Sequence, residues 1–211
     1  MMNKVLLFAV LLLLPLSMGA QSQEKAPDQY EVLLERLKAG KGTVDFKDLR
    51  MAYADTPGYD PYGTGKDNVR KQMFTALKEK KYENALQHAE SILKNTYVDI
   101  DAHIVSVEAY EALGKPEQAG RHKQIARGLI GSILESGNGK SPETAFPVIF
   151  VHEEYLVLSI LRLQPKSQSL VTVQGHSYDK LETVHSGTQK NVTLFFNIDV
   201  ISKWLTKTFQ K

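Results

Sequence analysis

The chain has 211 residues, which is enough for one domain or two small ones. Its 26 basic residues nearly balance its 24 acidic residues, and no block of like charge occurs, so nucleic acid is not an expected partner. The absence of cysteine excludes disulfide bonds, thiol catalysis and cysteine-ligated metals, and it excludes lipid attachment through an N-terminal cysteine.

Residues 1–20 have the pattern of a signal peptide. Lys4 supplies a positive start, residues 5–16 are almost uniformly apolar, and Ser17 to Ala20 offer small residues for cleavage. The apolar run is short for a membrane-spanning helix, and no later stretch is long and apolar enough to span. We therefore expect cleavage after Gly19 or Ala20 and a periplasmic or secreted protein without a transmembrane segment, with an uncleaved anchor as the alternative.

Two short helices are predicted after the polar stretch 21–27. Asp28 and Glu31 are spaced as a capping box for the first helix, which ends at Gly40. Asp45 is placed to cap the second helix. These two helices are expected to cover one end of the helical region that follows.

Residues 56–65 form a loop by their proline and glycine content. Tyr59 and Tyr62 are expected to pack on the core with their hydroxyls in water, and the alternative is that they face a ligand. Gly63-Thr64-Gly65-Lys66 resembles part of a phosphate loop. However, Asp67 follows the lysine where serine or threonine is required, and no strand precedes it, so we expect no nucleotide site here.

Residues 66–138 have the periodicity of four amphipathic helices joined in pairs. Their apolar positions are Val69, Met73, Phe74 and Leu77 in the first helix, Tyr82, Ala85, Leu86, Ala89, Ile92 and Leu93 in the second, Ala102, Val105, Ala109, Ala112 and Leu113 in the third, and Ala119, Ile125, Ala126, Leu129, Ile130 and Ile133 in the fourth. Asp99 is placed to cap the third helix, and Gly114 ends it.

The two helical pairs repeat one another. Ala119 follows Ala85 by 34 residues, which is the period of a tetratricopeptide repeat. The second pair has the turn glycine of that repeat at Gly114, whereas Lys80 stands at the equivalent position of the first pair. We therefore expect a tetratricopeptide-like region over residues 21–138, with an ordinary helical core and a chance match as the alternative.

From residue 139 to 211 the pattern indicates a small α+β region. Strands are predicted over 146–151, 169–173, 178–184 and 192–196, the last three forming an antiparallel meander, and helices over 153–163 and from Asp199 onward. A strand is the alternative for 156–161. The expected fold class is α+β: a mostly helical N-terminal two-thirds with helical hairpins, then a small antiparallel sheet with flanking helices, either as a separate unit or sharing one core with the helices.

Several short segments carry a resemblance to a known family. They are Asp45-Phe46 with Leu49-Arg50 and Tyr53, Tyr59-Asp60-Pro61-Tyr62, Glu153-Glu154-Tyr155, Gln168-Ser169-Leu170, His176-Ser177-Tyr178-Asp179, and Phe195-Phe196-Asn197 before Trp204. In these segments the chain resembles DUF4919, an uncharacterised family of secreted bacterial proteins. The resemblance covers most of the mature chain, and it implies a periplasmic or secreted bacterial protein without implying an activity or a site.

No catalytic motif is present. The six histidines are His88, His103, His122, His152, His176 and His185. None of them pair at i, i+4, and no acidic cluster surrounds them in the sequence, so no metal ligands are predicted. His152-Glu153 begins like a zinc-protease helix, but the second histidine is missing. His176 and Asp179 are expected to share at most a surface hydrogen bond, and the adjacent Glu153 and Glu154 cannot share a helix face. We predict no catalytic residues and no cofactor.

The leading functional hypothesis is a non-catalytic binding or scaffold protein of the cell envelope, whose partner is an unidentified protein or peptide. Two alternatives remain open. One is a small-ligand module in which the sheet and the Tyr59/Tyr62 loop form the cleft. The other is an enzyme whose site is assembled from residues scattered through the chain.

In tetratricopeptide arrays the first helix of each pair lines the groove. In the second pair, the groove positions by repeat register are Asp101, Ile104, Glu108 and Glu111. An acidic face with one apolar member suits a basic or amphipathic peptide, so these four residues are the predicted binding residues. A simply solvated helix face is the alternative.

Overall fold

The computed structural model describes residues 28–63 and 67–209, so the predicted signal peptide lies outside the described residues. The helices are α1 (Gln29–Lys38), α2 (Phe46–Ala54), α3 (Asp67–Lys78), α4 (Tyr82–Leu93), α5 (Ile100–Ala112), α6 (Pro116–Leu134), α7 (Val151–Ile160) and α8 (Asp199–Phe209), with a short 3-10 turn η1 (Pro142–Thr144). The strands are β1 (Phe146–Pro147), β2 (Leu163–Val173), β3 (His176–His185) and β4 (Asn191–Asn197). The predicted α+β class is confirmed.

The predicted helix starts agree with the structure because local side chains satisfy the first free amides. Asp28 accepts from the amide of Tyr30, and Asp99 accepts from the amide of Ala102 at 2.9 Å. Asp45 accepts from two amides at the start of α2, at 2.7 and 3.1 Å.

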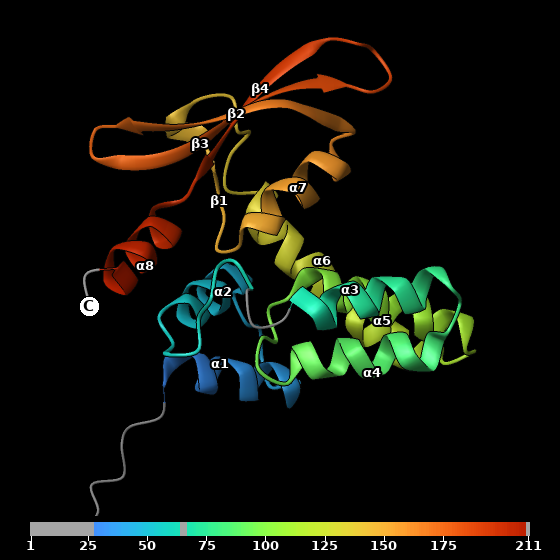
Figure 1. Ribbon diagram of the computed structural model, residues 1–211. Coiled ribbons are helices and arrows are strands. Elements are labelled where there is room, and N and C mark those ends of the chain that lie inside the picture. The colour runs from blue at the N-terminus through green and yellow to red at the C-terminus, as the bar shows by residue number, and fades with distance from the viewer. Residues whose placement is uncertain (1–27, 64–66, 210–211) are drawn as a thin grey trace, which may run out of the picture.

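Helices α3 to α6 form two antiparallel hairpins, which run together along one side of the molecule in Figure 1. Lys80 and Gly114 have left-handed backbone conformations, with φ of 58° and 68°, at the turns of the two hairpins. Ala85 and Ala119 are buried, with 0% and 2% exposure. The matching turn conformations and the burial of both alanines agree with the 34-residue offset between the two hairpins. The assignment to the tetratricopeptide family stays a prediction.

Two apolar positions of the predicted helices, Phe74 and Ala112, are exposed rather than buried. Phe74 is 44% exposed, whereas its neighbour Met73 is fully buried. Successive residues on a helix point about 100° apart, and the narrow buried face of α3 takes Met73 rather than Phe74. Met73 and Ala76 occupy the buried positions of α3, and Phe74 is left on the surface.

The sheet has the strand order β1-β4-β3-β2. β2, β3 and β4 form the predicted antiparallel meander, but β1 pairs with β4 in parallel, so the sheet is mixed rather than wholly antiparallel. The strand predicted over 146–151 is only two residues long. Glu153 accepts hydrogen bonds from the amides of Ile149 and Phe150, at 2.8 and 3.3 Å, and these bonds draw the chain into α7.

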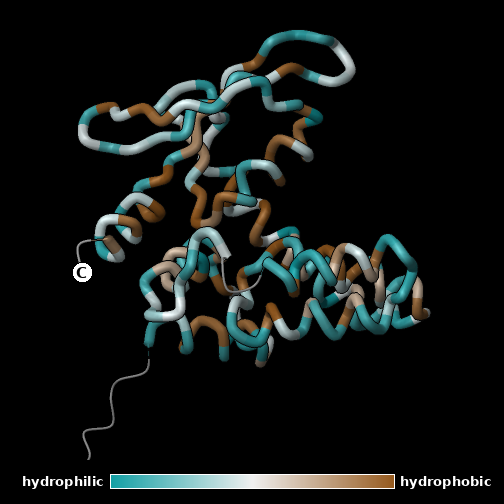
Figure 2. The backbone as a smooth tube through the Cα atoms, viewed as in Figure 1, coloured by the Kyte–Doolittle hydropathy of each residue, from teal (hydrophilic) through white to brown (hydrophobic). Residues whose placement is uncertain are grey.

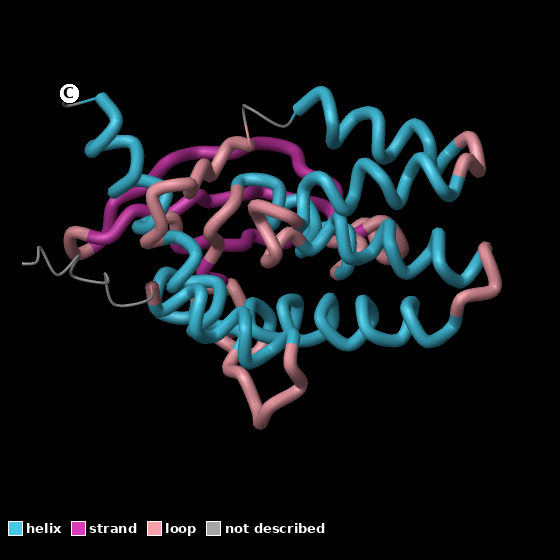
Figure 3. Tube along the Cα trace, turned by 90° about the horizontal axis from the view of Figure 1, so that it is seen from below, coloured by secondary structure: helices cyan, strands magenta, loops and turns pink. Residues whose placement is uncertain are grey.

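The sheet lies over α7, and α7 lies over the layer of N-terminal helices (Figure 1). Seen from the helical side, the strands pass behind that layer (Figure 3). Hydrophobic residues are concentrated between the layers, around β1 and α7 (Figure 2). One buried cluster there joins residues from α1, α2 and α6 with residues from α7, the sheet and α8. A second, smaller cluster lies among α3, α4 and α5. The division of the chain at residues 138 and 139 stays a prediction.

No helix in the described ranges 28–63 and 67–209 combines the length and the apolarity needed to cross a membrane.

Candidate functional site

Three consecutive polar residues at the start of α7 point in three directions. Because neighbours on a helix do not share a face, His152, Glu153 and Glu154 contact different parts of the protein. His152 lies near Asp101 of α5, Glu153 bonds Arg50 of α2, and Glu154 faces the sheet. The prediction that the two adjacent glutamates do not form a catalytic pair is consistent with this arrangement.

Glu153 has a structural role. Both its side chain and that of Arg50 are completely buried, and the guanidinium donates to the carboxylate at 2.6 and 3.3 Å. Arg50 also donates to the Pro147 carbonyl at 3.2 Å and to Ser132 at 3.3 Å. Every charged group here has partners, as a buried ion pair requires.

Glu154 lies in a different environment. Glu154 is fully buried. One of its carboxyl oxygens has no hydrogen-bond partner, and the other accepts a hydrogen bond from the Gln168 side-chain amide at 3.5 Å. The same amide donates to Asp179 of β3 at 2.8 Å. Burial, followed by the neighbouring Asp179 carboxylate, raises the pKa of Glu154 to about 9. Glu154 therefore carries a proton at neutral pH.

Exposed aromatic side chains flank this carboxyl pair. The Tyr155 hydroxyl donates to the side-chain carbonyl oxygen of Gln168 at 3.4 Å, and Tyr155 is 48% exposed. Tyr62 is 43% exposed, and burial together with the Asp179 and Glu154 charges raises its pKa. Its ring lies 6.1 Å from that of Trp204 on α8. We call Tyr62, Glu154, Tyr155, Gln168 and Asp179 the carboxyl–aromatic cluster.

Beyond Trp204, a cleft of about 880 Å³ separates α2 from α8. Its walls include the apolar Met51 and Val200 and the basic Lys203 and Lys207. This cleft is thus adjacent to the aromatic end of the cluster.

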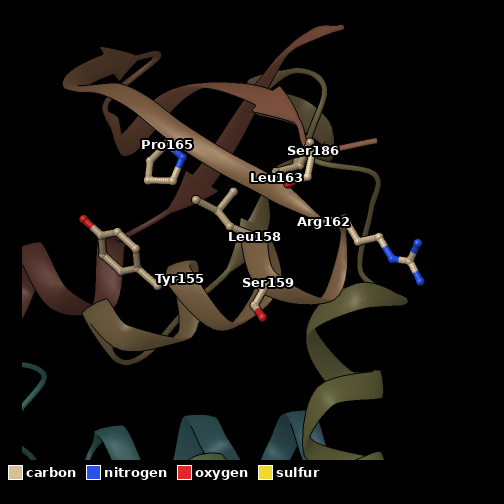
Figure 4. Close-up of a pocket in the computed structure, with 7 residues that line it drawn as sticks. All are labelled: Tyr155, Leu158, Ser159, Arg162, Leu163, Pro165 and Ser186. Atoms are coloured by element: carbon tan, nitrogen blue, oxygen red, sulfur yellow. The ribbon is translucent and has the colours of Figure 1, made fainter. Parts of the chain in front are cut away.

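A groove runs along α7 and β2 on the other side of Tyr155 (Figure 4). It has a volume of about 420 Å³ and is lined by Tyr155, Leu158, Ser159, Arg162, Leu163, Pro165 and Ser186. Leu158 points up toward the sheet, and the Arg162 guanidinium points away from the other side chains. The groove is therefore bordered by a helix and by the outermost strand of the sheet.

β2 has a free edge. It is the last strand in the sheet order, and residues 164–170 are all exposed. The amide of Ile198 donates to the Ser177 carbonyl, so the backbone N–H and C=O of Ser177 point toward β4 and away from β2. Thr172 is the residue of β2 opposite Ser177, so its backbone N–H and C=O point away from β3, to the free edge. By the same alternation, Leu170 and Gln168 also point their backbone groups to the free edge. Residues 167–173 contain neither charge nor proline.

A second polar cluster lies on the opposite side of α7. Asp99, Asp101 and His152 place ligand-type atoms within 4.8 Å of one another. Among the residues that the structure describes, this group has the composition and spacing that a metal ion would need. Arg70 already forms ion pairs with Asp99 and with Asp101, the latter at 2.8 Å. The sequence did not reveal this grouping, because α5 and α7 are far apart in sequence and meet only in the fold.

The four predicted binding residues all lie on α5. Asp101 is half-buried in the ion-pair cluster with Arg70, and burial raises its pKa. Ile104 is 37% exposed, Glu108 is exposed, and Glu111 is exposed and lies 3.5 Å from Lys123. The helix thus presents three of the four to solvent, and their role as a binding surface stays a prediction.

Two further expectations about single residues are corrected by the geometry. The Tyr59 hydroxyl is not in water: the residue is 4% exposed, and the hydroxyl donates to the Ile149 carbonyl at 2.5 Å. His176 pairs with Asp199 at 2.6 Å rather than with Asp179, because adjacent β-strand positions alternate faces.

A family model described as a domain of unknown function, DUF4919, matches residues 20–207. The chain belongs to the DUF4919 family. Comparison with curated proteins and with solved structures gives no match.

In this DUF4919 protein, the segments that carried the resemblance meet in space. Tyr62, Glu154, Tyr155, Gln168 and Asp179 come from four of those segments and form the carboxyl–aromatic cluster. Sequence reasoning missed this cluster because its members are spread over more than one hundred residues. The sequence did show polar and aromatic residues side by side in these segments, at positions where no structural role was evident.

Proposed function

We propose that this protein is a non-catalytic binding or scaffold protein of the cell envelope, and that it captures an extended segment of a partner protein along the free edge of β2. The observation that carries the proposal is the outward-facing backbone of Gln168, Leu170 and Thr172, on the strand whose earlier residues Leu163 and Pro165 line the groove along α7. An added strand would pair with those groups, and the part of the partner that continues toward Leu163 would reach the groove.

Two features favour a peptide as the occupant. The stretch 167–173 is free of the charges and prolines with which natural proteins usually protect an edge strand. The groove combines apolar side chains such as Leu158 with polar ones such as Ser159, which suits one side chain of a peptide rather than an extensive protein interface.

The test uses a photoreactive phenylalanine analogue in place of Tyr155, which borders the groove and is 48% exposed. Illumination in intact cells should join this position to a partner that mass spectrometry can identify. The second variant, Leu170→Pro, removes one outward-facing N–H. Because Leu170 does not use that N–H toward β3, the β2–β3 ladder is preserved.

The expected result is a cross-link that persists in the matched control Leu170→Ala and disappears in Leu170→Pro, with both variants folded by circular dichroism. A cross-link that survives Leu170→Pro would show that the edge is not used. A cross-link to a second copy of the chain would replace partner capture with self-association.

The exposed face of α5 is a proposed second contact surface, formed by Ile104, Glu108 and Glu111 with Asp101 at its end. Phe74 on α3 adds a second exposed apolar residue on the hairpin layer. Glu108→Lys with Glu111→Lys should weaken capture of a basic peptide partner, most visibly at low salt where screening is weakest. Equal capture by the wild type and the double variant would remove this surface from the proposal.

The envelope location rests on the pattern of residues 1–20. Protein isolated from the bacterial envelope should begin at Ala20 or Gln21 by N-terminal sequencing. Recovery of soluble cytoplasmic protein that still begins at Met1 would contradict export.

The carboxyl–aromatic cluster supports a second candidate, a small-ligand site. A buried glutamate with a raised pKa beside a second carboxyl group, with exposed tyrosines around it, is the type of arrangement that marks a candidate functional site. A ligand that contacts Asp179 should shift the NMR signals of residues 168 and 179 and leave those of α5 unchanged.

A further inference from the structure

We propose that the carboxyl–aromatic cluster receives a cationic side chain, the guanidinium of arginine or the ammonium of lysine, from the segment captured along β2. This inference rests on the proposed strand capture and adds the chemistry of one residue of the partner. The occupant is therefore an extended peptide with a basic residue facing α7.

The first reason is a missing counter-charge. Three buried carboxyl groups of the described chain invite comparison: Glu153, Asp99 and Glu154. Glu153 has the guanidinium of Arg50, and Asp99 has that of Arg70. Within residues 28–63 and 67–209, neither Glu154 nor its neighbour Asp179 has a basic side chain within ion-pair distance.

The second reason is an unpartnered atom at the cluster. Glu154 is fully buried, yet one of its carboxyl oxygens has no hydrogen-bond partner. Two carboxyl groups at such close range cannot both be ionised unless a cation lies between or beside them, so the empty protein keeps a proton on the pair. A ligand cation at the half-exposed Asp179 would let that proton leave to solvent.

The groups that face Glu154 make the arrangement specific. Asp179 comes from β3, Gln168 from β2, and Tyr62 from the loop after α2. The charge of the preceding Glu153 also acts on Glu154, although the Glu153 side chain points to Arg50. Lys180 lies on the opposite face of β3, where it bonds Glu182 at 2.8 Å, so it does not supply the missing charge. The ring of Tyr62 is exposed and adds the attraction of an aromatic face for a cation.

The distance from the free edge fits a long basic side chain. Leu170 pairs with Asp179 across the β2–β3 ladder, on the same face of the sheet. A strand added to β2 lies two strand spacings from β3, about 10 Å. An arginine or lysine opposite Leu170 would lay its methylene groups over that 67% exposed side chain and bring its charge to Asp179.

The experiment uses a probe too short to pair as a strand, so that it tests the cation site separately. Nα-acetyl-arginine methylamide is titrated into the isotopically labelled mature chain, and the matched probe is the citrulline derivative, which is nearly isosteric but uncharged. The arginine probe should shift the Gln168 side-chain amide and the Asp179 backbone amide and bind at least tenfold more tightly than the citrulline probe. Calorimetry at pH 7 in buffers of different ionisation enthalpy should detect proton release.

Three variants complete the test. Asp179→Asn should abolish the difference between the two probes. Glu154→Gln should keep arginine binding but eliminate proton release, because the amide has no proton to lose at this pH. Glu182→Gln, on the same strand but on the opposite face, should behave like the wild type.

Equal affinity for the two probes, or no change at residues 168 and 179, would overturn the cation site. Strand capture would then be tested by the Leu170→Pro cross-linking experiment alone. If that cross-link is unaffected by proline while the arginine probe binds as described, the cation site remains and strand capture is lost.

Discussion

Replacing Arg50 by methionine is expected to destabilise the fold by about 3–5 kcal/mol, because it leaves a buried carboxylate without its counter-charge. The Arg50 and Glu153 side chains are both completely buried, with the shorter of their two hydrogen bonds at 2.6 Å. The substitution also removes donors to the Pro147 carbonyl and to Ser132. Methionine preserves much of the length and volume of the side chain, so the loss reports mainly on the charge and the hydrogen bonds.

The measurement is urea unfolding at pH 7 followed by circular dichroism. With a denaturant slope of about 2 kcal/mol/M, a loss of that size lowers the midpoint by roughly 1.5–2.5 M. Arg50→Met with Glu153→Gln should recover part of the loss, since replacing both members of a buried pair costs less than removing one. The control Arg121→Met breaks an exposed pair with Glu117, and it should change the unfolding free energy by under about 0.5 kcal/mol.

Two results would refute this reasoning. One is a midpoint for Arg50→Met that is no lower than that of the Arg121→Met control. The other is a double variant that is no more stable than Arg50→Met, since an unpaired buried charge would then not be the source of the loss.

Three further predictions concern stability. Ala119→Leu should cost about 1–3 kcal/mol, because the residue is 2% exposed at a helix contact, and a wild-type melting temperature would contradict the packing. Burial lowers the pKa of His103 to about 4, so its neutral form stabilises the fold above pH 6.5 and this stability is lost as pH falls toward 4. At pH 5 the free energy of unfolding should be about 2 kcal/mol lower than above pH 6.5. The variant His103→Leu is itself destabilising, but it should lose most of this pH dependence. An unchanged pH dependence in the variant would assign the effect to other groups. The pKa of Glu154 is raised to about 9, so its stabilising contribution is complete below pH 4.5 and declines as pH rises toward 9. Glu154→Gln should therefore gain stability relative to the wild type on going from pH 5 to pH 8, by about 1.4 kcal/mol per pH unit at most, and a constant difference between the two proteins would refute the shift.

Features that depend on neighbouring residues were predictable from the sequence. Asp45 and Asp99 begin helices because their side chains bond amides two or three residues away, and Gly114 ends one because a left-handed residue closes the last turn. The 34-residue offset placed Lys80 and Gly114 at equivalent turns, and both adopt the left-handed conformation. The α+β class followed from the change in hydrophobic period near residue 139.

Features that depend on distant segments were decided by the tertiary structure alone. Arg50 and Glu153 are separated by 103 residues, and Gln168, which bonds both Glu154 and Asp179, comes from a different strand from Asp179. The position of β2 at the edge of the sheet, which the proposed function requires, follows from β1 joining β4 on the opposite side. Local hydrogen bonds and side-chain periodicity specify which elements form, because they act over a few residues. Which elements become neighbours is decided by burial of their combined apolar surfaces, and only that packing brings Glu154 and Asp179 together without a counter-charge.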